Sequence, residues 1–133
     1  MTAPEGIFTS NGGSVDLNNF QLTLAAKFTL PPLPTDVPLP WVIIGKAVIE
    51  NFDGDPQNAT AQLLLDDVVI DSDEIRLAGC GDGPAVGQCV SLQAAFRQTL
   101  KQAALVEMKC STYIGRVIDT KLAAISLSTL HTV

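Results

Sequence analysis

Apolar and polar residues alternate over residues 20–30, in the stretch FQLTLAAKFTL. The apolar members all fall on one parity: Phe20, Leu22, Leu24, Ala26, Phe28 and Leu30. An apolar residue at every second position is typical of a strand that buries one of its faces. We therefore expect an outer strand over this stretch.

A proline-rich segment separates this strand from a more apolar one. Residues 31–40, PPLPTDVPLP, contain five prolines, which exclude a helix or a central strand and predict an ordered, extended crossover. The next stretch, WVIIGKAVIEN (41–51), is rich in β-branched residues and starts with apolar residues on both parities. That pattern predicts a central strand covered on both faces.

The remaining pattern consists of short strands and turn signals. Residues 59–65 alternate, Asp66 and Asp67 predict a tight turn, and DSDE (71–74) is expected to be a solvated acidic turn. Residues 121–130, KLAAISLSTL, predict a closing strand. Strands at this spacing indicate an all-β sandwich or barrel.

Residues 91–107 fit two periods. Apolar residues recur every fourth position from Leu92, and the Ala, Gln, Lys and Leu content favours a helix. The segment also alternates with period two, and its flanks, CVSL and KCSTY, carry β-branched and aromatic residues. We predict two long strands joined near LKQAA (100–104), with one helix around 91–107 as the alternative.

Length and composition predict a single domain that self-associates, and they argue against nucleic-acid binding and a membrane span. The 133 residues form a single expected domain (1–133), with 1–40 as outer strand and crossover and 41–130 as the main sandwich. Hydrophobic residues make up 47% and charged residues 17%, so we expect another subunit to cover apolar surface. A net charge of −6 argues against nucleic acid as a partner. The chain contains no apolar run long enough for a membrane span.

The amino-terminal stretch MTAPEGIFTS has neither the basic nor the apolar region of a signal peptide. The compartment stays open on this evidence. An extracellular, cell-surface or virion location is the expectation that agrees best with the other features of the chain.

Several segments together resemble a known family. They are GKAVIEN (45–51), DGDPQNA (53–59), VSLQ (90–93), CSTYIG (110–115) and KLAAISL (121–127). This order resembles the tumour-necrosis-factor-like and complement-globular-head jelly-roll domains of the small bacterial or phage-associated kind, over residues 41–130. The resemblance implies a trimeric jelly roll without an active site, in which apolar residues near a threefold axis form the subunit interface.

This expectation leads to a set of interface residues. The strands 41–51 and 121–130 carry more large apolar side chains than one sandwich core needs. We predict that at least one of these strands buries side chains across the threefold axis, with the candidates Trp41, Ile43, Ile49, Ile125 and Leu127.

A metal site has weak candidates in the stretch NFDGDPQNAT (51–60). Counting an EF-hand loop from Asp53 places Asp55 at position 3, but Asn58 falls where the motif needs glycine. The pattern favours a strand-to-strand loop, in which Asp-Gly supplies a left-handed position. A looser calcium site at Asp53, Asp55 and Asn58 is the alternative, and no other cofactor is expected.

The cysteines permit one intrachain disulfide at most. Cys80 and Cys89 bracket a Gly/Pro-rich loop that a disulfide could close, and two free thiols are the alternative. Cys110 is expected to be a buried small hydrophobic residue. Zinc is not expected, because the only histidine, His131, lies near the carboxyl end.

No catalytic residues are expected. A Ser–His or Cys–His pair is poorly supported with His131 at the carboxyl end, and Asp66 and Asp67 are adjacent, so on a strand they would face opposite ways. Trp41 and Tyr113 could each stack on a sugar ring, or lie in the core or an interface. We therefore predict a non-catalytic structural or assembly protein, with a carbohydrate- or ligand-binding module, with or without calcium, as the alternative.

Overall fold

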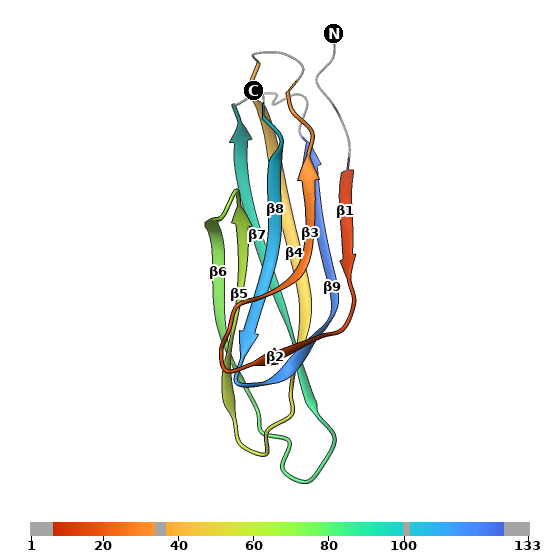
Figure 1. Ribbon diagram of the computed structural model, residues 1–133, viewed down its shortest axis with the longest axis vertical. Helices are drawn as coiled ribbons and strands as arrows, with labels where there is room; N and C mark the ends of the chain where they lie inside the picture. Colours follow the sequence, from red (N-terminus) through yellow and green to blue (C-terminus); the bar gives the residue numbers. More distant parts are fainter. Residues whose placement is uncertain (1–6, 34–36, 100–101, 127–133) are drawn as a thin grey trace, which may run out of the picture.

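The computed structural model describes residues 7–33, 37–99 and 102–126, and all regular structure in them is β-strand (Figure 1). The strands are β1 Ile7–Gly12, β2 Val15–Asn18, β3 Thr23–Leu30, β4 Leu39–Asn51, β5 Gln57–Leu65, β6 Val68–Leu77, β7 Val86–Gln98, β8 Ala104–Thr112 and β9 Ile114–Ser126. The predicted all-β sandwich is confirmed. The two long strands β7 and β8 replace the alternative helix around 91–107.

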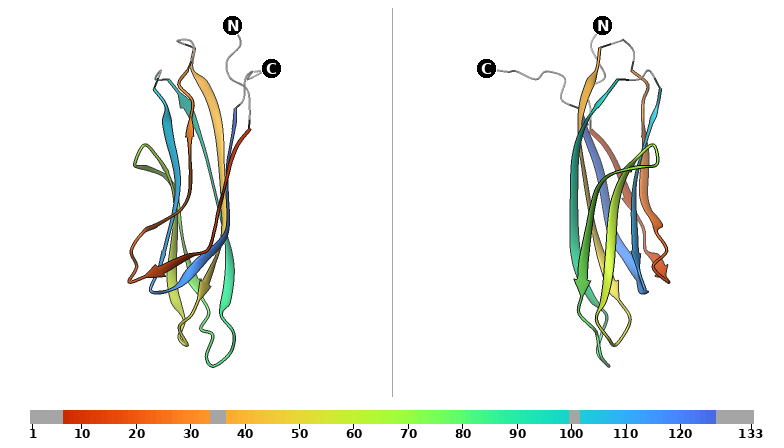
Figure 2. Two further views of the ribbon diagram at one scale, coloured as in Figure 1. Left: turned by 45° about the vertical axis from the view of Figure 1, so that its right-hand side comes forward. Right: turned by 90° about the vertical axis from the view of Figure 1, so that its left-hand side faces the viewer.

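The strands form two antiparallel sheets that pack face to face (Figures 1 and 2). The order β1-β9-β4-β7, with β2 also paired to β9, makes up sheet A, and the order β3-β8-β5-β6 makes up sheet B. If β1 and β2 are counted as one interrupted strand, this is the eight-strand order of a jelly roll. The first forty residues thus contribute strands to both sheets.

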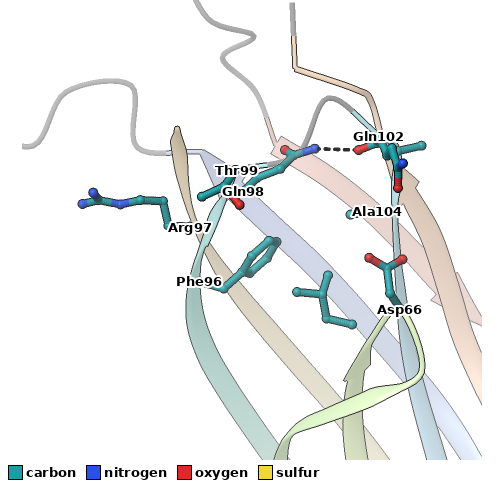
Figure 3. Close-up of a pocket in the computed structure, with 9 residues that line it drawn as sticks. Asp66, Phe96, Arg97, Gln98, Thr99, Gln102 and Ala104 are labelled. Atoms are coloured by element: carbon teal, nitrogen blue, oxygen red, sulfur yellow. Dashed lines mark hydrogen bonds between the residues drawn. The ribbon is translucent and has the colours of Figure 1, made fainter. Parts of the chain in front are cut away.

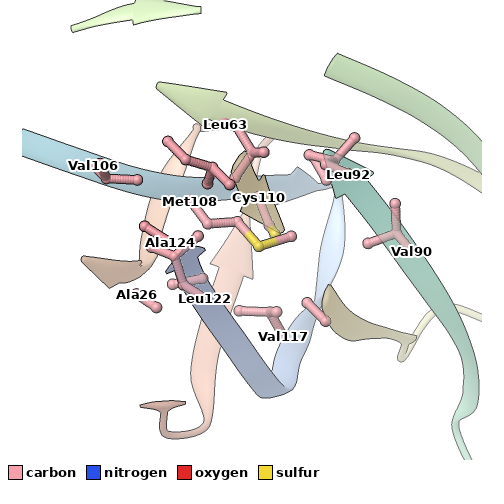
Figure 4. Packing of buried hydrophobic residues seen from close by; sticks show 14 of the residues in the cluster. Ala26, Leu63, Val90, Leu92, Val106, Met108, Cys110, Val117, Leu122 and Ala124 are labelled. Atoms are coloured by element: carbon pink, nitrogen blue, oxygen red, sulfur yellow. The ribbon is translucent and has the colours of Figure 1, made fainter. Parts of the chain in front are cut away.

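The core lies between the inner faces of the two sheets (Figure 4). Leu63 and Met108 of sheet B pack toward sheet A at Gly45, where a Cβ atom would lie 2.9 Å from a side-chain atom of each. Val106 and Leu122 add to the same cluster and are at most 1% exposed. The missing side chain at Gly45 therefore provides space for the facing sheet.

A buried polar network connects the start of β4 to the end of β7, and both strand ends lie at the upper end of the sandwich in Figure 1. Trp41 is 1% exposed, and its indole N–H donates to Gln98 Oε1 at 2.9 Å. The Gln98 amide nitrogen donates to the carbonyl oxygens of Pro31, at 3.1 Å, and Gln102, at 3.2 Å. Because these buried polar groups are paired, Trp41 can anchor the core without a desolvation penalty.

The local structure differs from the expectation at two places. Phe20 and Leu22 precede β3 and are exposed, because the chain turns at residues 19–20 and the register shifts between Leu24 and Ala26. The DSDE stretch (71–74) is not a turn but part of β6. The tight turn at Asp66–Asp67 is confirmed, and both residues have the positive φ typical of a two-residue hairpin loop.

Candidate functional site

The outer face of sheet A is apolar near the upper end of the sandwich. Val42 and Ile44 point away from the core on β4 and are half-buried. The register places Val42 between Ala95 of β7 and Ile125 of β9, and Ile44 beside Ala123 of β9. These five half-buried or exposed residues form one continuous surface on three neighbouring strands, which we call the upper outer patch.

The outer face of sheet B carries polar and apolar residues. Lys27 lies opposite Glu107, and Gln62 lies opposite Lys109. This face also carries Leu64, which is only 7% exposed, the half-buried Leu105, and Val69, which pairs with Leu64 at the edge strand β6 and is 46% exposed. Since antiparallel sandwiches normally present polar side chains on their outer faces, the apolar outer face of sheet A calls for a cover.

Charged residues border the upper outer patch. Lys46 lies directly opposite Lys121 on the outer face of sheet A, and both are exposed. An open depression of about 420 Å³ is lined by Ile44, Lys46, Asp71 and Gln93 among others. Two like charges side by side repel each other, so carboxylates are favoured at this border, and Asp71 of the same chain already supplies one there.

The structure corrects the predicted interface residues. Trp41, Ile43 and Ile49 are at most 1% exposed and pack inside a single chain, so they are not available to a second subunit. Ile125 lies on the outer face and belongs to the upper outer patch, while Leu127 lies outside the described residues. Both predicted strands, β4 and β9, carry apolar side chains on their outer face. On β4 the even-numbered residues form this face, whereas the predicted interface residues are odd-numbered.

The loop after β4 is held by buried amides. Asn51 is fully buried, and its Nδ2 donates to the carbonyl oxygens of Asp55 at 3.0 Å and Ala78 at 2.9 Å. The Gln57 side-chain nitrogen donates to Asn51 Oδ1 and to the Ile114 carbonyl oxygen. These bonds join the β4–β5 and β6–β7 loops, which project together from the lower end in Figure 1.

The calcium candidates take part in separate local contacts. Asp53 Oδ1 accepts a long hydrogen bond, 3.5 Å, from the Asp55 backbone N–H. Asn58 Oδ1 accepts from Arg76 Nη1 at 3.0 Å, so a guanidinium cation already occupies that oxygen. Within the described parts of the chain, no three His, Cys, Asp or Glu side chains are grouped to hold a metal ion. Calcium binding in this loop stays a prediction.

All three cysteines are free thiols in the structure, so the candidate disulfide between Cys80 and Cys89 is not formed there. The Cys80 thiol instead lies 3.1 Å from the Asp53 carbonyl oxygen. Cys89 is exposed on β7. Cys110 is a buried core residue, and burial raises its thiol pKa to about 12.

We expect two of the three thiols to react rapidly with Ellman's reagent in the native protein at mildly alkaline pH. The third, Cys110, should react only after unfolding, because it is buried and its raised pKa disfavours the reactive thiolate. Counting reacted thiols before and after adding guanidinium chloride tests this. No rapidly reacting group in freshly purified protein, with a single one after unfolding, would indicate that Cys80 and Cys89 are bonded.

A small cavity lies at the upper end of the sandwich (Figure 3). It has a volume of about 140 Å³ and lies between the β5–β6 turn and the facing ends of β7 and β8, with Phe96 among its lining residues. Asp66 Oδ1 accepts from the Leu105 backbone N–H at 2.8 Å, and the Gln98 amide is bonded as described above. The hydrogen bonds of these polar side chains connect separate segments of the chain.

The two proposed sugar platforms have different environments. Trp41 is a core residue and cannot stack on a ligand. Tyr113 is 42% exposed, and its ring contacts that of Phe20 with centroids 5.7 Å apart. Sequence reasoning did not select Phe20 as a site residue, because its alternation with Leu22 resembled a buried strand face.

Two further expectations from the sequence concern the membrane and catalysis. No helix long and apolar enough to cross a membrane occurs in the described segments. His131 lies outside these segments, so its predicted exclusion from catalysis stays a prediction.

No protein-family model and no curated protein matches the chain. Solved structures show its fold. Dimeric latent PorU from Porphyromonas gingivalis is similar with a TM-score of 0.61 at 10% identity, over 96% of this chain and 13% of that one. The VP2 protein of infectious bursal disease virus, in its D431N form, is similar with a TM-score of 0.52 at 9% identity, over 96% and 32%. A VP2 subviral particle gives 0.50 at 11% identity, over 96% and 33%.

These likenesses cover about a third or less of each matched chain. They place the protein among β-sandwich, jelly-roll-like domains. At such low identity they concern the fold alone.

Proposed function

We propose that the protein is a non-catalytic structural or assembly protein, a homo-oligomer whose chains associate through the upper outer patch. The observation that carries this proposal is the apolar outer face of β4 and β9, two paired inner strands of sheet A. The pattern of residues 41–51 predicted cover on both faces, and the chain itself covers only the inner one. A second copy is the cover that we propose.

Apolar burial at this patch supplies only part of the free energy that association requires. Completing the burial of Val42, Ile44 and Ile125 contributes about 1 kcal/mol each, since each is already half-buried. Association costs at least about 4 kcal/mol in lost rotational and translational freedom. Contributions from both partners and from the Lys46–Lys121 border must therefore add to the apolar term.

A trimer is the stoichiometry we propose. It rests on the resemblance to tumour-necrosis-factor-like and complement-globular-head domains, which assemble around a threefold axis. In such an assembly the protein would serve as a surface, fibre or particle component.

Ile44→Asp is expected to convert the oligomer into a folded monomer, because each subunit interface would then have to bury a carboxylate among apolar groups. Light scattering after size exclusion should give about three times the 14.0 kDa chain mass for the original protein and a single chain mass for the variant. Thermal unfolding should confirm that the variant stays folded, since position 44 does not face the core.

Gln62→Asp is the matched control. Gln62 occupies the corresponding half-buried outer position on the inner strand β5 of sheet B, opposite Lys109, so the new carboxylate has a favourable neighbour. This variant should keep the full oligomer mass. An original protein that is monomeric at micromolar concentration, or an oligomeric Ile44→Asp variant, would refute the proposal.

A further inference from the structure

The β2–β3 connection, the end of β4 and the β8–β9 turn lie toward the lower end of the sandwich in Figure 1, away from the start of β4, and they carry exposed apolar residues. Five of these residues make up a second exposed apolar surface. We call this surface the aromatic end; it consists of Phe20, Leu22, Phe52, Tyr113 and Ile114, which are 39–54% exposed. Three of the chain's seven aromatic residues thus lie where water can reach them.

The backbone holds the ring of Phe20 in this exposed place. The backbone N–H of Asn19 donates to the Tyr113 carbonyl oxygen at 2.8 Å, and that of Phe20 to the Thr112 carbonyl oxygen at 3.1 Å. Asn19 and Phe20 have φ values of 53° and 58°, a left-handed conformation that is rare for a bulky residue. Strain of this kind persists where the surroundings enforce it, and it often accompanies a binding site.

The two exposed rings form one platform. The Phe20 and Tyr113 centroids are 5.7 Å apart, and the ring planes are inclined by only 31°. The two rings thus form one exposed aromatic pair against which the apolar face of a ligand can pack. The platform lies on the surface and not in a pocket, so it suits a ligand that lies across it.

The charge at this end argues against an anionic ligand. Arg116 lies at the aromatic end beside Phe52. Its guanidinium lies over the Phe52 ring at 5.3 Å, and its Nε lies 2.6 Å from Glu50 Oε1. Its charge is thus already balanced. Asp16 pairs opposite Arg116 in the register and adds a further negative charge.

Three neutral amide residues neighbour Phe20 along the chain. Asn18, Asn19 and Gln21 are exposed and flank Phe20 in the sequence, and Asn18 lies opposite Ile114 in the β2–β9 register. An amide side chain both donates and accepts hydrogen bonds, as hydroxyl groups require. Aromatic faces edged with amides match the apolar C–H face and the hydroxyl edge of a pyranose ring.

We propose that the aromatic end binds a neutral oligosaccharide. A pyranose ring stacks on Phe20 and Tyr113, and the amides of Asn18, Asn19 and Gln21 bind its hydroxyl groups. This site is independent of the upper outer patch, which lies at the opposite end of β4.

Immobilised cellohexaose, laminarihexaose, mannohexaose and chitohexaose test the proposal, with a heparin hexasaccharide as the anionic comparison. We expect saturable binding to at least one neutral hexasaccharide and none to heparin. Phe20→Asn and Tyr113→Ala should each weaken it roughly tenfold, the effect of losing one aromatic contact. Asparagine is chosen at position 20 because it tolerates the left-handed backbone.

Two controls separate sugar binding at this site from nonspecific apolar adsorption and from association between copies. Val68→Ala removes a 64% exposed apolar side chain at the β5–β6 hairpin and should leave binding unchanged. Ile44→Asp should bind the same hexasaccharide free in solution with unchanged intrinsic affinity per chain, although a dissociated variant loses avidity on the immobilised probe, so the two proposals fail separately. Absence of binding to all four neutral probes would overturn the sugar site. A change in oligomer mass on Phe20→Asn would also overturn it, and would indicate that the aromatic end is a contact between copies of the chain.

Discussion

Asn51→Ala is expected to lower the free energy of unfolding by about 3 kcal/mol. Asn51 is fully buried and bonds two carbonyl oxygens, those of Asp55 and Ala78, from different loops. Its Oδ1 also accepts from the Asp53 backbone N–H at 2.8 Å and from Gln57. Removing the amide leaves these groups without partners, and those that stay buried carry the full desolvation cost.

Urea denaturation followed by fluorescence or circular dichroism measures the effect. Asn58→Ala is the matched control seven residues away, because Asn58 is exposed and its bond to Arg76 lies in water. We expect the control to lose less than about 1 kcal/mol. Equal losses for the two variants would show that Asn51 does not hold the loops together.

Gly115→Ala is expected to destabilise the fold by about 3 kcal/mol or more. A Cβ atom at position 115 would overlap the Glu50 carbonyl oxygen and lie 3.1 Å from Thr112 Cγ2. The oxygen belongs to the backbone of β4, so the clash is relieved only if β4 and β9 separate where they pair. The pairing of β4 with β9 positions both the hydrogen bonds of Asn51 and the residues of the aromatic end.

Gly13→Ala provides the comparison, because a Cβ atom there meets nothing within 4 Å. The same urea experiment should give a change of less than about 1 kcal/mol for this variant. A stable Gly115→Ala protein with an unchanged unfolding midpoint would mean that the β4–β9 contact is looser than the structure indicates.

The sequence by itself determined the fold class and several local elements. Alternation over 59–65 and the β-branched content of 41–51 required strands, and the pair Asp66–Asp67 required a hairpin turn. These features depend on neighbours in the chain, because side-chain alternation and turn conformation are local properties. For the same reason the excess of apolar residues on β4 was visible before the fold was known.

Only the tertiary structure decided which side of each strand faces the core. The start of β4 is apolar on both parities, so the sequence pattern did not show which parity faces the core. In the structure Trp41 and Ile43 face sheet B, and Val42 and Ile44 face outward. The aromatic end was hidden for a related reason. A left-handed turn and a register shift before residue 26 break an alternation that looks continuous in the sequence, and thereby expose Phe20. Orientation depends on contacts between residues far apart in the chain, and one strand's own pattern does not contain them.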